Sequence, residues 1–141
     1  MVNILCALKA EAEPIVDHFR LKQIRRRSPY RLFENHDIQL RISGVGKHCM
    51  AAAARSLFAH QTDRPGAGWL NLGIAGHATL PLGSICLATK VTDGTGGDSW
   101  FPPQIYRWAH HRREIVTVEQ PESNYPSQAL YDMEAASFVA T

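Results

Sequence analysis

The sequence has no long apolar run, few cysteines and almost no excess charge of one sign. No segment approaches the roughly 18 apolar residues that a membrane-spanning helix needs, and the N-terminus lacks the pattern of a signal peptide. The 15 basic and 13 acidic residues leave a formal net charge of +2, which gives no broad electrostatic argument for nucleic acid binding. We therefore expect no membrane partner and no nucleic acid partner.

The three cysteines, Cys6, Cys49 and Cys86, are an odd number and lie far apart. Each stands among apolar or small residues, which is typical of buried thiols. Reduced thiols fit a reducing compartment, so we expect a cytoplasmic protein. The pair His110 and His111 adds no recognisable metal-ligand spacing, because adjacent side chains point in different directions in regular structure. The sequence therefore indicates no metal site.

Apolar strand-like segments alternate with helical ones over 141 residues, a length that fits one domain with its own core. Strands are predicted at 2–8, 30–33, 38–42, 69–72, 84–91, 115–118 and 129–131, and helices at 11–19 and 47–60. This alternation favours an α/β sheet, and the turn-forming residues 34–37 predict a hairpin that makes the sheet mixed. Pro14 suits the first turn of the first helix. In the second helix, Met50, Ala54, Leu57 and Phe58 are predicted to share one side.

The segment Ser43–Lys47 invites a comparison with phosphate-binding loops. A Walker A loop would need a glycine in place of Arg41 and a hydroxyl residue in place of His48, and a dinucleotide fingerprint would need a glycine in place of Cys49. What remains is a tight turn from a strand to a helix. It is either structural or an anion-binding turn, whose backbone N–H groups would face the anion. The candidate anion-binding residues are Ser43, Gly44 and Gly46.

Two glutamates and one small-residue segment stand at predicted strand ends. Glu11 and Glu134 each follow a predicted strand, where a carboxylate either stabilises a helix start or takes part in acid–base chemistry. The segment Gly73–Gly76 carries little side chain, so it either forms a sharp bend or lets a flat ligand lie close to the backbone.

Four segments, in this order, together resemble the purine nucleoside phosphorylase and nucleosidase family, in particular the methylthioadenosine/S-adenosylhomocysteine nucleosidases. They are Ile4–Glu11, Ser43–Lys47 with the alanine-rich helix after it, Asn71–Gly76 followed by Leu82–Ile85, and Asp132–Ala135. The resemblance implies an α/β fold with three αβα layers around a mixed central sheet, as a single domain over residues 1–141. It implies cleavage of the N-glycosidic bond of a purine nucleoside or thionucleoside by hydrolysis, without a cofactor, in a homo-oligomer.

The resemblance also implies residue roles. Glu11 stands where the nucleosidases have the glutamate that activates the attacking water, and Glu134 where they have the carboxylate that binds the ribose hydroxyls. Met133 would pack against the sugar, and Ala75 and Gly76 would lie along the base. Ile74 replaces a serine near the water, and His77 replaces the second glycine of the family motif.

The chain departs from the family most clearly after the segment Asp132–Ala135. Family members continue into another strand and a Ser-Asp motif, whose aspartate protonates the leaving purine. We therefore expect a chain that lacks the last part of this fold and that is weak or inactive by itself.

Two alternatives to hydrolysis stay open at the sequence level. One is a phosphate-dependent phosphorylase, in which Arg25–Arg27 or the Gly44–Gly46 turn would hold phosphate. The other is a nucleoside-binding fragment with weak or no catalysis.

Overall fold

The computed structural model describes residues 1–25, 28–59, 66–105, 107 and 109–141. Arg26 and Arg27 of the basic run and the predicted last helical residue His60 lie outside the described residues. The chain divides into two compact units, Met1–Gly73 with Thr141, and Ile74–Ala140. The single domain expected over residues 1–141 stays a prediction.

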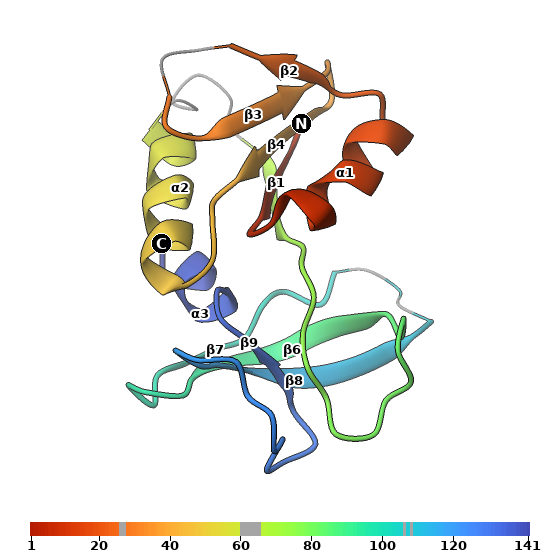
Figure 1. The fold of residues 1–141 in the computed structure, drawn as a ribbon, viewed down its shortest axis with the longest axis vertical. Coiled ribbons are helices and arrows are strands. Elements are labelled where there is room, and N and C mark those ends of the chain that lie inside the picture. The colour runs from red at the N-terminus through yellow and green to blue at the C-terminus, as the bar shows by residue number, and fades with distance from the viewer. Residues whose placement is uncertain (26–27, 60–65, 106, 108) are drawn as a thin grey trace. The chain divides into compact units, whose positions relative to one another are not determined.

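The first unit contains a five-stranded mixed sheet (Figure 1). Its strands are β1 (Val2–Cys6), β2 (Lys22–Ile24), β3 (Arg31–Glu34), β4 (Ile38–Ile42) and β5 (Gly68–Asn71), in the order β2-β3-β4-β1-β5. Strand β1 is parallel to both β4 and β5, whereas β2, β3 and β4 pair antiparallel. The predicted hairpin of β3 and β4 is confirmed. Strand β2 was not predicted, because its side chains are mostly exposed and it carries no apolar run.

Two helices, α1 (Lys9–His18) and α2 (Lys47–Ala59), cover opposite faces of this sheet (Figure 1). Ala12 of α1 packs in one buried cluster with Cys6 and Leu40. Arg41 follows Leu40 and therefore points to the other face of the sheet. There its Nη1 donates a hydrogen bond to the carbonyl of Ala53 in α2 at 3.1 Å. The first unit thus has the three αβα layers that the family resemblance implied.

Three details of the helical and cysteine predictions were wrong. Helix α1 begins at Lys9, so Pro14 lies inside it rather than in its first turn. Phe58 is 68% exposed, because the buried side of α2 turns instead through Met50, Ala53, Ala54 and Leu57. Cys49 is exposed and Cys86 half-buried, and only Cys6 is a buried thiol.

The second unit contains a four-stranded sheet and one short helix. The strands are β6 (Cys86–Asp93), β7 (Ser99–Trp100), β8 (His111–Thr117) and β9 (Leu130–Asp132), in the order β7-β6-β8-β9. Strands β6, β8 and β9 are parallel, and β7 is antiparallel to β6. Helix α3 (Ala135–Val139) packs on this sheet through Ala135 and Ala136, against Val91, Ile115 and Leu130.

The predicted α/β class is confirmed, because each unit contains a mixed sheet with at least one flanking helix. In the described part of the chain, no helix is both long enough and apolar enough to cross a membrane.

Candidate functional site

Three chain segments that the sequence singled out meet at one edge of the first unit's sheet. Cys6, the last residue of β1, pairs with Ile42 at the end of β4, and Leu5 pairs with Asn71 at the end of β5. The carboxyl ends of three parallel strands therefore lie side by side, which is where open α/β sheets place their ligands. Glu11, the Ser43–Gly46 turn and Gly73 come after these three strand ends.

Glu11 is held in place by the start of helix α1. It is the third residue of the helix, and its Oε2 accepts a hydrogen bond from the backbone N–H of Leu8 at 2.8 Å. This capping interaction satisfies a donor that the helix itself leaves open, and the helix dipole favours a carboxylate there. The same side chain approaches Gly73, since a methyl carbon built on the Gly73 Cα would lie 3.1 Å from Oε1. The half-buried carboxylate thus lies against the backbone that leaves β5.

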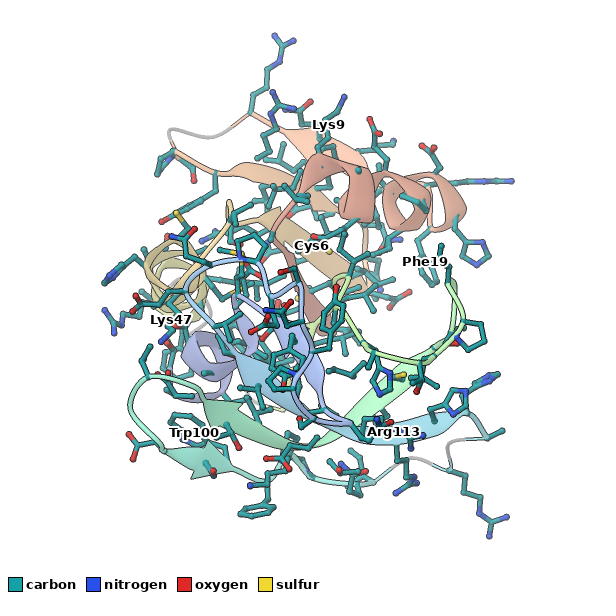
Figure 2. All side chains as sticks on the ribbon, turned by 60° about the horizontal axis from the view of Figure 1, so that its bottom comes forward. Cys6, Lys9, Phe19, Lys47, Trp100 and Arg113 are labelled. Carbon is teal, nitrogen blue, oxygen red and sulfur yellow. The ribbon has the colours of Figure 1, made fainter. Side chains whose placement is uncertain are left out.

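The Cys6 thiol lies close enough to Glu11 to be affected by its charge. Burial, and to a lesser extent the negative charge of Glu11, raise the pKa of the Cys6 thiol to about 12. The thiol is therefore neutral at physiological pH and is a packing group rather than a nucleophile. Figure 2 labels Cys6 at the end of β1 and Lys9 at the start of α1, the two residues between which the chain turns.

The Ser43–Gly46 turn uses two of its backbone donors inside the fold. Ser43 N–H donates to the Cys6 carbonyl at 2.8 Å, and Gly44 N–H donates to the Ala7 carbonyl at 3.1 Å. Gly44 and Gly46 have φ values of +87° and +94°, which side chains disfavour. These bonds extend the pairing of β4 and β1 beyond the strands, which favours the structural interpretation of the turn over the anion-binding one.

In the second unit, Gly76 is fixed by strand β9 and covered by an aromatic ring. Gly76 and Tyr131 exchange two backbone hydrogen bonds of 2.9 Å. A methyl group built on Gly76 would overlap the ring of Tyr125, whose hydroxyl oxygen would lie 2.6 Å from it. Tyr125 has a φ of 44° in the left-handed region, so it holds this position at a cost in backbone strain. Tyr125 therefore occupies the space over the glycine that the sequence placed along a base.

His77 stabilises the same segment. Its Nδ1 accepts backbone N–H bonds from Thr79 and Leu80, each 3.1 Å long. With Nδ1 accepting, the proton lies on Nε2, which donates to the Gln128 carbonyl at 3.0 Å. His77 thus ties residues 77–80 to the segment before β9, where the family motif has a glycine.

The end of β9 carries a buried carboxylate that sequence reasoning did not single out. Asp132 accepts hydrogen bonds from the Thr117 hydroxyl at 2.7 Å and from the backbone N–H groups of Glu134 and Ala135 at 3.0 and 2.6 Å. Burial raises the pKa of Asp132, and these three bonds oppose that shift. The Thr117 hydroxyl in turn accepts the Ala136 N–H at 2.9 Å. Asp132 and Thr117 therefore cap the N-terminus of α3. The sequence signal for this cap is the aspartate three residues before the first residue of the helix.

The predicted site residues fall in both units. Glu11 and the candidate turn residues belong to the first unit, where the structure brings them to one sheet edge. The substrate-binding candidates belong to the second, where Ile74 is 75% exposed and Met133 and Glu134 are half-buried. Within the described ranges, no group of three or more His, Cys, Asp or Glu side chains could hold a metal ion.

No protein family model matches the sequence, and no curated protein matches it. Several solved structures, in contrast, match the fold of the chain. The chain superimposes on a 5'-methylthioadenosine/S-adenosylhomocysteine nucleosidase from Colwellia psychrerythraea, in complex with adenine, with a TM-score of 0.79 and 19% identity over 99% of this chain and 74% of that one. The corresponding nucleosidase from Neisseria meningitidis, in complex with methylthio-immucillin-A, gives a TM-score of 0.74 and 16% identity over 99% and 78%.

A futalosine hydrolase mutant of Helicobacter pylori matches as well, with a TM-score of 0.70 and 16% identity over 99% of this chain and 81% of that one. At identities this low, the structural similarity establishes the fold, and the activity has to be inferred from the residues themselves. The chain has the nucleoside phosphorylase/nucleosidase fold, as its four sequence motifs predicted.

Proposed function

We propose that the chain hydrolyses the N-glycosidic bond of a purine nucleoside or thionucleoside. One observation carries the proposal. In the fold of the nucleosidases, a half-buried glutamate, Glu11, lies at the shared carboxyl edge of three parallel strands, anchored through one oxygen by the Leu8 N–H.

The proposed chemistry rests on what an ionised carboxylate can do. Glu11 takes a proton from a water molecule, the water oxygen bonds to the anomeric carbon, and the bond from that carbon to the base nitrogen breaks. Positive charge develops on the sugar as this bond breaks, and a nearby carboxylate stabilises it. Glu134 would accept hydrogen bonds from the two ribose hydroxyls, because an ionised carboxylate is an acceptor only.

The other proposed contacts come from small or apolar residues. Met133 would pack against the sugar and Ala75 would lie along the base, whereas the ring of Tyr125 covers Gly76, the other residue expected there. Supporting these contacts, solved nucleosidases of this fold hold adenine or methylthio-immucillin-A.

Hydrolysis is favoured over phosphorolysis by the local hydrogen bonds. Two backbone donors of the Ser43–Gly46 turn already bond to the carbonyls of Cys6 in β1 and Ala7 after it, so these donors do not face an anion.

The proposed partner of the chain is a small-molecule purine nucleoside, and the proposal includes no cofactor. We further propose that the protein is cytoplasmic, because its cysteines are free thiols, which fit a reducing compartment. We also propose a homo-oligomer, because among the described residues β5 is an edge strand of its sheet and edge strands favour association. Sedimentation analysis would detect a monomer that contradicts this.

The test is release of free purine from methylthioadenosine and adenosine, with and without phosphate. We expect slow release without phosphate, in line with the weak activity that the sequence predicts, and a further loss of about 100-fold or more in kcat for Glu11→Gln. Glutamine retains an oxygen that accepts the Leu8 N–H, so the cap survives the change. The matched control is Glu13→Gln in the same helix, whose exposed side chain pairs with Lys9.

Normal turnover in Glu11→Gln would contradict the assignment of the base. Release that depends on phosphate would instead establish a phosphorylase.

A further inference from the structure

We propose that Gly73 is a positioning residue for Glu11, because the missing side chain at 73 leaves the room in which the carboxylate lies. This inference rests on the proposed function, in which Glu11 is the general base. It adds a second residue, on a different strand end, that decides where the base sits.

The space around Gly73 is defined by Glu11. A methyl carbon built on Gly73 would have Glu11 Oε1 at 3.1 Å, Cδ at 3.6 Å and Oε2 at 3.7 Å as its three nearest neighbours. The backbone at Gly73 is not in the left-handed region, so its conformation accepts an L-residue. The approach of the carboxylate, rather than the backbone, is therefore what requires a glycine.

Glu11 has little freedom to withdraw. Its Oε2 is bound to the Leu8 N–H at 2.8 Å, and its backbone is the third residue of α1. The helix start is fixed in turn by the Ala12 N–H, which donates to the Leu8 carbonyl at 3.2 Å. A methyl group at position 73 would therefore turn the carboxylate or lengthen its bond to Leu8 by a few tenths of an ångström.

Such a displacement matters to a general base. A base must stand about 2.6–3.2 Å from the heavy atom that carries the proton it removes, and a misplacement of about 1 Å costs on the order of 100-fold in rate. For a shift of a few tenths of an ångström we expect Gly73→Ala to lower kcat about tenfold and to leave KM nearly unchanged.

The matched control is Gly68→Ala, at the first residue of β5, the strand that Gly73 follows. Among the residues that the structure describes, a methyl group on Gly68 would meet no heavy atom within 4 Å, and the φ of Gly68 is also outside the left-handed region. We expect its kcat and melting temperature to equal those of the wild type. A general effect of replacing a glycine in or just after β5 would lower the kcat and the melting temperature of both variants alike.

The deciding experiment combines a double-mutant cycle with an NMR measurement. Gly73→Ala should lower kcat in the wild type and have no further effect in Glu11→Gln, because the base is then already lost. The Leu8 amide resonance should shift in Gly73→Ala and stay in place in Gly68→Ala.

An equal loss in both backgrounds, or an unmoved Leu8 resonance, would overturn the inference. The two failures are distinguishable: full activity in Glu11→Gln would reject the proposed function, whereas the Leu8 resonance tests the positioning without reference to activity.

Discussion

Replacing Asp132 by alanine should destabilise the Ile74–Ala140 unit by about 3 kcal/mol. The carboxylate accepts three hydrogen bonds, and two of the donors, the Thr117 hydroxyl and the Ala135 N–H, are buried. A buried donor left without an acceptor costs about 1–3 kcal/mol, and loss of a helix N-cap about 1 kcal/mol. Two such donors and the cap together would cost about 5 kcal/mol of folding free energy. Burial of the Asp132 carboxylate, which raises its pKa, is itself unfavourable and offsets part of that cost, so we expect a loss of about 3 kcal/mol.

The measurement is urea denaturation at pH 7, combined with hydrogen exchange of the Ala135 and Ala136 amides. Thr117→Val should cost about 2 kcal/mol, because it removes a donor to Asp132 and the acceptor of the Ala136 N–H. Since the two side chains share one bond, the double variant should lose about 1 kcal/mol less than the sum of the single losses. Wild-type stability in Asp132→Ala, or strictly additive losses, would refute this account of the cap.

The second unit allows two more predictions. Because burial raises the pKa of Asp132 above 3.8, its folded form binds a proton more tightly than the unfolded chain, so its contribution is full below pH 3.8 and is lost as pH rises through the raised pKa. Urea denaturation at stepped pH should show the stability of wild type relative to Asp132→Asn falling across that window, and a constant difference would contradict the linkage. Gly76→Ala should lower stability by about 1–3 kcal/mol through overlap with the Tyr125 ring. Calorimetry should show Tyr125→Gly restoring most of that loss in the same background, and an unaffected Gly76→Ala would be the contrary result.

The strands that sequence reasoning found are those with apolar runs. Strands β1, β4 and β6 carry such runs, and their positions were predicted to within a few residues. Strand β8 was found only in its second half, because its first residues, His111 to Glu114, are polar and are exposed or half-buried. Strand β7 has two residues, too few for any periodicity. Local pattern therefore located the buried parts of the sheets and missed their exposed ends.

The sequence predicted the individual residues of the candidate site, but it did not predict which of them lie close together. The position of Glu11 after a strand was readable from its neighbours. Its approach to Gly73 depends on the register of β1 against β5, which pairs Leu5 with Asn71 across a long stretch of chain. The ring of Tyr125 over Gly76 depends likewise on a loop conformation with φ of 44°, for which a tyrosine gives no sequence signal.

The four residues from Gly73 to Gly76 differ in how well their positions accommodate a substitution. The first faces the Glu11 carboxylate and the last faces the Tyr125 ring, each within its own unit, so neither position accommodates a side chain without displacing a neighbour. Ile74 and Ala75 between them are exposed, and Ile74 to 75%. We therefore expect substitutions to be tolerated better at these two middle positions than at Gly73 or Gly76, because they can change what the segment touches while both flanking contacts are kept.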